Sequence, residues 1–112
     1  MGMEASEVAK AYFECMRARD LGVVDLFHDD ACLIGLGGVK SGKDAIREFY
    51  KGSIEGASPS PSLVGDLLAS GLRVAAEIQI ALADGSKVHA VDVFVVEDGK
   101  IRSLTYFIAD HG

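Results

Sequence analysis

One acidic residue, Asp92, is expected to point into the apolar interior of the fold, where a carboxyl group has unusual chemistry. It lies in the alternating segment 87–97, two residues before Phe94 and on the same face. An ionised carboxylate that is buried without a partner is costly, so burial favours the protonated form. A protonated Asp92 could donate a hydrogen bond to a ligand oxygen. The alternative is a buried aspartate that is satisfied by Tyr106 or a backbone group and has no further role.

Two tyrosines in the apolar stripes of predicted helices are the other candidates for site chemistry. Tyr12 lies in a helix predicted at about residues 4–18, and Tyr50 lies in a helix that begins after Ser41. Ser41 and Asp44 resemble a capping box at the start of this second helix. A buried tyrosine hydroxyl needs a hydrogen-bond partner. Each tyrosine could therefore be an ordinary core residue or could present its hydroxyl to a ligand.

The direction of Asp92 depends on how the strands of the second half pair. Strands are predicted at about residues 62–69, 72–83, 87–97 and 101–109, separated by glycine-containing turns. A three-residue turn at 84–86 places Asp92 opposite Ile78, and a three-residue turn at 98–100 places it opposite Tyr106. Both registers keep hydrophobic side chains on one face and turn Asp92 toward them.

The order of the elements predicts an α+β fold. The first half contains the helix at 4–18, a short helix at 21–27 with Asp20 as its N-cap, a strand at 31–34 and the helix after Ser41, followed by a loop at 56–61. Three helices followed by an antiparallel meander indicate helices packed on one face of a curved sheet. With 112 residues, a single domain spanning 1–112 is expected.

Composition and charge argue against several classes of protein. The chain has 17 acidic and 11 basic residues, a formal net charge of −6, which argues against nucleic-acid binding. No apolar run approaches the ~20 residues of a membrane span, and the first residues lack a signal-peptide pattern. Two cysteines, Cys15 and Cys32, fit a reducing cytoplasm. Histidines and acids lack metal-ligand spacing, so neither a metal nor another cofactor is expected.

Four segments, in order and with matching spacing, carry a resemblance to a known family. They are Val-Ala-Lys-Ala-Tyr-Phe at 8–13, the segment 20–31, Ser-Gly-Lys-Asp-Ala-Ile-Arg-Glu-Phe-Tyr at 41–50, and the segment 91–101 that contains Asp92 and the Asp-Gly turn. Together they resemble the NTF2-like superfamily, in its ketosteroid isomerase and SnoaL-like branch. The resemblance implies a cone: three N-terminal helices packed on a curved, mostly antiparallel sheet that encloses an apolar pocket.

The resemblance also implies a set of site residues. Isomerases of this kind stabilise an enolate oxygen with a tyrosine and a protonated aspartic acid, while a carboxylate base moves a proton between carbons. By position, the tyrosine corresponds to Tyr12, the protonated acid to Asp92 and a supporting tyrosine to Tyr50. The base position falls on Gly35, and residues 33–40 contain no carboxylate. An oxyanion hole without a general base is expected, and an aspartate introduced at Gly35 is expected to raise isomerase activity.

Hydrophobic and aromatic residues are predicted to complete the pocket, and others to form an interface. The predicted ligand-binding residues are Tyr50, Phe49, Leu36, Ile78, Phe94, Leu104, Tyr106 and Ile108. Val91, Val93, Val95 and Phe107 point to the outer face of the sheet, where a solvated strand would carry polar residues. A symmetric partner would bury this strip, so a homodimer is expected, as the resemblance also implies.

Three functions remain open at this stage. The first is an enzyme that acts on an apolar carbonyl compound, as an isomerase, aldol-type cyclase or lyase, with Tyr12 and Asp92 polarising the oxygen. The second is a non-catalytic protein that binds an apolar small molecule, which accounts more simply for Gly35. The third is a dimerisation module whose cone is filled by its own side chains.

Overall fold

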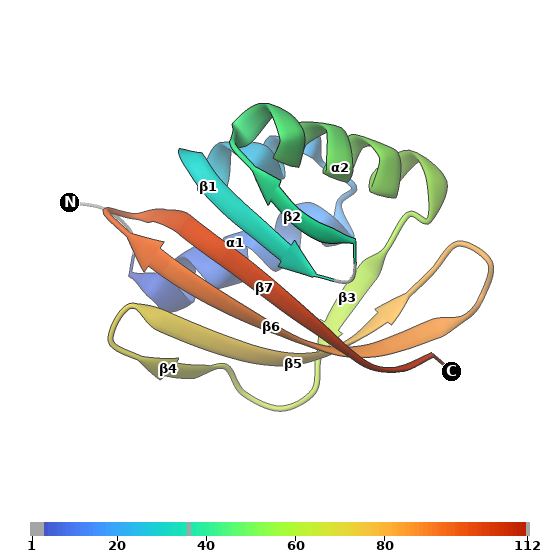
Figure 1. Ribbon diagram of the computed structural model, residues 1–112. Helices are drawn as coiled ribbons and strands as arrows, with labels where there is room; N and C mark the ends of the chain where they lie inside the picture. Colours follow the sequence, from blue (N-terminus) through green and yellow to red (C-terminus); the bar gives the residue numbers. More distant parts are fainter. Residues whose placement is uncertain (1–3, 36, 112) are drawn as a thin grey trace.

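The computed structural model describes residues 4–35 and 37–111, with the elements arranged as in Figure 1. In chain order they are α1 (Ala5–Arg17), the 3₁₀ helix η1 (Leu21–Leu26), β1 (Phe27–Gly35), β2 (Gly38–Ser41), α2 (Lys43–Gly56), β3 (Ser60–Leu63), β4 (Leu68–Ser70), β5 (Arg73–Ala81), β6 (Lys87–Glu97) and β7 (Lys100–His111). The predicted α+β class is confirmed. None of the helices in these two stretches is long and apolar enough to cross a membrane.

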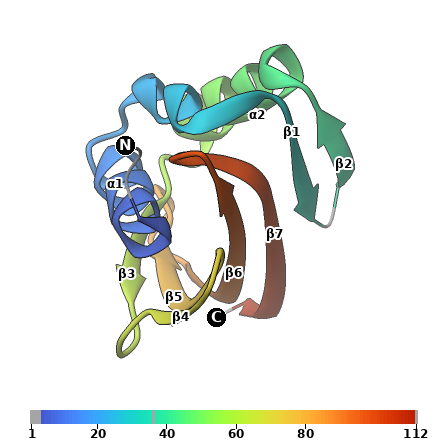
Figure 2. The same ribbon diagram turned by 90° about the vertical axis from the view of Figure 1, so that its left-hand side faces the viewer.

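Seven strands form one open, curved sheet. Six follow the order β2-β1-β7-β6-β5-β3, and β4 pairs with the edge of β5. All neighbours are antiparallel except β1 and β7, which run parallel. Figure 2 shows the sheet curling around α1, while α2 covers the end formed by β1 and β2. The cone predicted from the resemblance is therefore the observed architecture.

Side chains accept hydrogen bonds from the first backbone N–H groups of α1 and η1, but not of α2. Glu4 and Glu7 form a reciprocal capping box at the start of α1, and the Asp20 carboxylate accepts a hydrogen bond from the backbone of Gly22 at 2.8 Å. The predicted N-cap at Asp20 is confirmed. The predicted capping box at Ser41 is wrong, because α2 starts at a Gly42 N-cap without a side-chain hydrogen bond and Ser41 belongs to β2.

Strict alternation in β6 fixes the direction of Asp92. The even-numbered residues from Val88 to Val96 are buried, and the odd-numbered residues between them are only half-buried. Period-two alternation is the geometry of an extended strand with one face against a core. Asp92 therefore faces inward together with Phe94, as the sequence predicts, and is 5% exposed.

The two hairpins reach this arrangement by different turns from those predicted. Asp92 lies opposite Ala76 rather than Ile78, because the β5–β6 connection holds five residues, 82–86, instead of three. A two-residue shift leaves every side chain on the same face. In the β6–β7 hairpin, Asp92 lies opposite Tyr106 as predicted.

A bulge explains why the β6–β7 register is correct although the turn is shorter than predicted. Glu97 pairs with Lys100 across a two-residue Asp98-Gly99 turn in which both residues have positive φ, 53° and 78°. The register then shifts by one residue, which leaves Arg102 as the extra residue of β7. The bulge restores the inward direction of Leu104 and the alternate residues after it.

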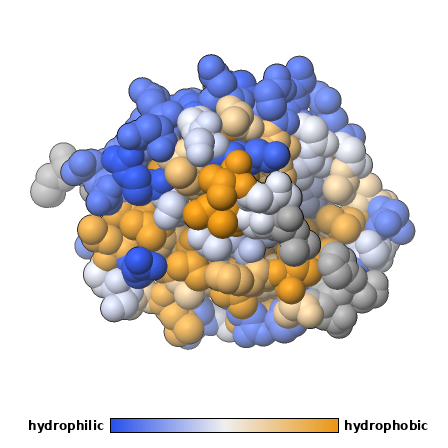
Figure 3. Space-filling model, viewed as in Figure 1, coloured by the Kyte–Doolittle hydropathy of each residue, from blue (hydrophilic) through white to orange (hydrophobic). Residues whose placement is uncertain are grey.

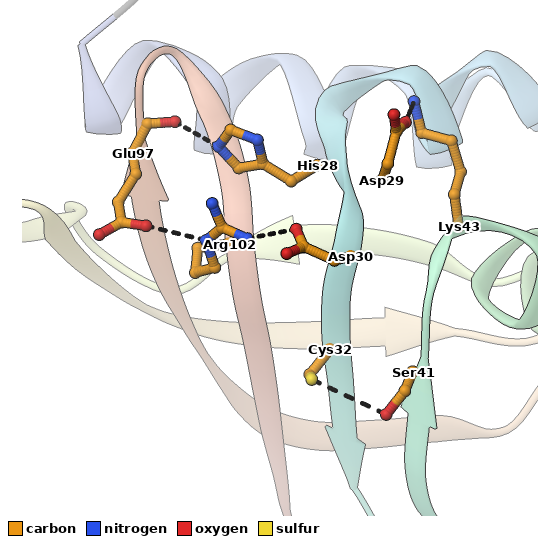
Figure 4. A network of polar contacts seen from close by, with 8 residues as sticks. All are labelled: His28, Asp29, Asp30, Cys32, Ser41, Lys43, Glu97 and Arg102. Carbon is orange, nitrogen blue, oxygen red and sulfur yellow. Dashed lines mark hydrogen bonds and ion pairs between the residues drawn. The ribbon is translucent and has the colours of Figure 1, made fainter.

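Polar side chains extend β1 backward beyond the predicted strand at 31–34 (Figure 4). The bulged Arg102 donates from Nε to Glu97 Oε1 at 2.8 Å and forms an ion pair with Asp30 of β1. The ring of His28 hydrogen-bonds the Glu97 carbonyl oxygen at 2.6 Å. These contacts hold a polar stretch of β1 beside β7, and no hydrophobic pattern marks that stretch as a strand.

Two further predicted boundaries differ from the structure. The strand predicted at 62–69 is two short strands, β3 and β4, and the predicted loop at 56–61 contributes the first residues of β3. Pro61 pairs opposite Ile80. It is tolerated there because β3 is an edge strand, where a missing N–H need not break a ladder.

Truncation of Leu104, which is 1% exposed, is expected to lower the free energy of unfolding by about 2–5 kcal/mol. The matched control is Leu68, which is 71% exposed and should change stability by less than about 0.5 kcal/mol on truncation. Urea unfolding of Leu104→Ala and Leu68→Ala measures both values. Equal losses would contradict the placement of β7 over the core.

Candidate active site

A cavity of about 260 Å³ lies between the two α-helices and the inner face of the sheet. Its lining is mostly apolar: Phe13, Met16, Phe49, Ala57, Pro59, Pro61, Ile78, Ile80, Leu82, Val88, Ala90 and Ile108. The polar side chains that reach it are Tyr12, Tyr50, Ser53, Asp92 and Tyr106. An apolar cavity with a few convergent polar groups is the usual form of a small-molecule site.

The cavity brings together seven of the predicted site residues. Tyr12, Phe49, Tyr50, Ile78, Asp92, Tyr106 and Ile108 all line it. Phe94 and Leu104 do not, which corrects the sequence prediction for both. The ring of Phe94 packs against those of Tyr12 and Phe13, with centroids 5.2 and 5.6 Å apart, and Leu104 pairs beside it in the core. Leu36 lies outside the described residues.

The hydroxyl groups of Tyr12 and Tyr50 form a buried hydrogen-bonded pair, with oxygens 2.9 Å apart. Both side chains are buried, and desolvation raises the pKa of each phenol well above its ordinary value. Both groups therefore stay protonated at neutral pH. When Tyr50 donates to Tyr12, the hydroxyl hydrogen of Tyr12 is free to donate to a ligand oxygen.

None of the hydrogen bonds among the described residues involves Asp92, and no fully enclosed side-chain oxygen lacks a partner, so the Asp92 carboxyl oxygens open onto the cavity. Burial in the apolar wall raises the pKa of its carboxyl group to about 7. Its carboxyl group therefore faces the cavity and is open to water or to a ligand, and neither Tyr106 nor a described backbone group hydrogen-bonds it. At neutral pH the protonated form, which can donate a hydrogen bond, is well populated.

The ring of Tyr106 fills the space where a side chain at position 35 would lie. Ile34 pairs with Thr105 in the parallel β1–β7 ladder, which brings Gly35 beside Tyr106. A Cβ atom on Gly35 would lie 1.9 Å from the Tyr106 Cζ atom. An aspartate at position 35 would overlap with the Tyr106 ring as it stands, so the predicted gain in isomerase activity requires this ring to move.

The arrangement can polarise one oxygen atom in an apolar setting. Tyr12 supplies a neutral phenol donor, and Asp92 supplies a carboxyl group that donates when protonated. Within the described lining, Asp92 is the single carboxyl group, so no second acid or base accompanies it. Across residues 4–35 and 37–111, no cluster of three or more histidine, cysteine or acidic side chains could hold a metal ion.

Sequence patterns could have identified part of the lining that was not predicted. Phe13 and Met16 lie next to or one turn beyond Tyr12, and Val88 and Ala90 share the inward face of β6 with Asp92. Ala57, Pro59 and Pro61 carry no such signal, because they follow α2 in a segment without a regular period. Their place at the cavity depends on β3 pairing along the edge of β5.

Comparison with protein families finds one match that covers most of the chain. Residues 9–104 match the family described as SnoaL-like domain. A comparison with curated proteins finds no match.

Solved structures with the same fold accompany this family match. A protein from Sinorhizobium meliloti proposed to be a polyketide cyclase has a TM-score of 0.82 at 20% identity, over 90% of this chain and 94% of that chain. A protein from Kribbella flavida proposed to be a ketosteroid isomerase has a TM-score of 0.83 at 19% identity, over 95% and 78%. An NTF2-like protein of unknown function from Cytophaga hutchinsonii has a TM-score of 0.82 at 12% identity, over 97% and 93%. At these identities the likeness shows the fold.

The raised pKa of Asp92 predicts a stability that falls as the pH rises. In the folded protein Asp92 keeps its proton up to about pH 7, whereas in the unfolded chain it loses the proton near pH 4. The free energy of unfolding therefore decreases as the pH rises from about 4 to about 7. The full shift corresponds to about 4 kcal/mol. Asp92→Asn should remove this slope, measured as urea unfolding at pH 4.5, 6 and 8. The control is Asp66→Asn, at an exposed loop carboxylate, which should keep it. Parallel profiles for Asp92→Asn and the unsubstituted protein would contradict the assignment.

Proposed function

Because this chain belongs to the SnoaL-like domain family, we propose that it is a small-molecule enzyme that acts on an apolar carbonyl compound. In this proposal Tyr12 and protonated Asp92 donate hydrogen bonds to the substrate oxygen, and Tyr50 supports Tyr12. The observation that carries the proposal is an unpaired, buried carboxyl group that shares one apolar cavity with a tyrosine hydroxyl pair. Such pre-arranged donors stabilise negative charge that develops on an oxygen during a reaction.

The reaction class follows from what the two donors could stabilise. The structural relatives proposed to be a polyketide cyclase and a ketosteroid isomerase would both form an enolate-like oxygen during their reactions. The same oxygen in this cavity would receive hydrogen bonds from Tyr12 and Asp92. Isomerisation, aldol-type cyclisation and related lyase reactions all fit this requirement.

The position of Gly35 limits which of these reactions would be efficient. A positioned general base typically contributes ~10²–10⁴-fold to a proton transfer. Position 35 provides none, and the ring of Tyr106 occupies the space of its missing side chain. We therefore expect slow isomerisation of 3-oxosteroids, and expect a substrate group or a water molecule to carry the proton.

A second candidate function is the binding of an apolar ligand without turnover. Position 35 has no side chain, and the Tyr106 ring fills the space where a base would lie. This favours binding without turnover, because binding alone needs no proton carrier. The mostly apolar lining would bind such a ligand by burial of its surface alone. This function predicts binding that depends little on the hydroxyl of Tyr12 or on the carboxyl group of Asp92.

Absorbance titration of 2-naphthol distinguishes the two candidates. An oxyanion hole should favour naphtholate, so bound naphthol should ionise at a lower pH than free naphthol. Tyr12→Phe and Asp92→Asn should each weaken naphtholate binding about tenfold, because each removes one hydrogen bond to a charged oxygen. Asp66→Asn, which removes an exposed carboxylate, is the control. Binding that is unchanged in both site variants would favour the non-catalytic candidate, and no binding at all would favour a purely structural module.

We also propose that the outer face of the sheet binds a second copy of the chain. Val91, Val93 and Val95 are half-buried there, and Phe107 is 57% exposed. Figure 3 shows hydrophobic side chains gathered over the sheet on this face. An apolar strip along a sheet face is the kind of surface that a symmetric partner covers.

The free thiols of Cys15 and Cys32 support a reducing, cytoplasmic setting for the protein.

Phe107→Glu tests this interface. A charge buried in the interface beside Val91, the pairing partner of Phe107, should shift the mass measured by sedimentation equilibrium from a dimer to a monomer. Val39→Glu is the matched control, because Val39 is 59% exposed but lies on the edge strand β2, which β1 separates from β7. The interface proposal would not survive a Phe107→Glu protein that remains dimeric, or an unsubstituted protein that is monomeric at tens of micromolar.

A further inference from the structure

The place of Tyr106 depends on the absence of a side chain at Gly35. A Cβ atom on Gly35 would lie 1.9 Å from Cζ of Tyr106, and 2.2 and 2.3 Å from its two Cε atoms. Real Cβ atoms do not approach other heavy atoms this closely. The end of the phenol ring therefore lies directly over the Gly35 backbone, and any other residue at position 35 would push it away.

This direction of Tyr106 keeps the front of Asp92 open. The two residues are direct neighbours across the β6–β7 ladder, on the same inner face. Side chains at such paired positions are normally in contact. Here the ring leans across β7 toward β1, and the Asp92 carboxyl group has no hydrogen-bond partner in the described chain. We expect a ring displaced from Gly35 to move into the cavity that it already lines together with Asp92.

Tyr106 also forms an aromatic wall of the cavity together with Phe49 of α2. Their ring centroids are 6.4 Å apart and their planes are tilted by 31° to one another. Both line the cavity, whose volume is about 260 Å³. Aromatic faces arranged in this way favour contact with another flat ring over a puckered one.

We propose that the Gly35–Tyr106 pair determines the ligand specificity of the cavity, and that it selects flat aromatic compounds of one or two rings that carry a single hydroxyl or carbonyl oxygen. The ring of the ligand lies against Tyr106 and Phe49, and its oxygen is directed at Tyr12 and Asp92. The direction of the oxygen rests on the proposed function. The selection of a flat ring rests only on the aromatic wall and on Gly35.

Substitution of Gly35 tests the dependence of Tyr106 on glycine. Gly35→Ala should displace the Tyr106 ring into the cavity. Because the ring would then fill space that the ligand needs, 2-naphthol binding should weaken at least about tenfold. The double variant Gly35→Ala/Tyr106→Ala removes the clash and should recover affinity relative to Gly35→Ala. The control is Gly52→Ala in α2, where a Cβ atom meets nothing within 4 Å. Unchanged binding by Gly35→Ala, or a double variant no better than Gly35→Ala, would overturn the proposal.

A second measurement needs no substitution at Gly35 and so does not depend on the folding of those variants. The unsubstituted protein should bind naphthalene more tightly than its saturated counterpart decalin, neither of which carries an ionisable group, and Tyr106→Ala should reduce this ratio about three- to tenfold. An unchanged ratio would overturn the aromatic wall. This outcome is distinct from failure of the proposed function, since the ratio does not report on ionisation. If the protein prefers the flat ring but its 2-naphthol binding does not depend on Tyr12 or Asp92, the specificity proposal holds and the proposed function fails.

Discussion

The burial of one carboxyl group without a partner is the constraint on which the rest of the site depends. Removing Asp92 from water raises its pKa to about 7, and no described neighbour offsets the cost with a hydrogen bond. Its polar contacts come from whatever enters the cavity, which is water or a ligand. The surrounding cavity is otherwise apolar, so a ligand oxygen near Asp92 would meet little competing polarity beyond the tyrosine hydroxyls.

The three tyrosines at the cavity have different roles. Tyr12 and Tyr50 satisfy each other at 2.9 Å, which fixes the Tyr12 oxygen in place before a ligand enters. Such pre-arrangement reduces the reorganisation needed when charge develops on the ligand. Tyr106 takes no part in this hydrogen bond, and its ring packs against the Gly35 backbone and Phe49. The cavity thus combines one rigid donor, one titratable group and one aromatic wall.

Much of this arrangement is encoded in local sequence patterns. The alternation in 87–97 is enough to place Asp92 inward, and the helical stripes place Tyr12 and Tyr50. The observed β5–β6 register differs from the predicted one by two residues. The same side chains still face the core, because a shift by an even number of residues keeps each side chain on its face of the sheet. Phe94 and Leu104 show the limit of that reasoning. Parity identifies the inner face, but the depth at which the rings of α1 cover it depends on packing between distant segments.

The contact between Gly35 and Tyr106 could not be read from the sequence, because it depends on the parallel register of β1 against β7. Those strands are separated by 64 residues, from Gly35 to the start of β7, and no turn connects them directly. The polar network around Arg102 joins the two strands where their pairing is interrupted, between Phe27 and Cys32, and its residues have no hydrophobic period. A glycine in a strand signals a close approach of some neighbour, but the identity of the neighbour comes from the fold.

The bulge at Arg102 makes the two hairpins unequal in their tolerance of chain length. One residue added to or removed from the stretch between Glu97 and Leu104 would reverse the phase of β7 and carry Tyr106 to the opposite side of the sheet. The connection at 82–86 precedes β6, and the β5–β6 pairing that follows it runs without a register shift, so length changes confined to residues 83–86 leave the phase of β6 and β7 intact. Loops can therefore be grafted at 83–86, next to the cavity-lining Leu82, whereas the length of the turn at Asp98-Gly99 must be kept.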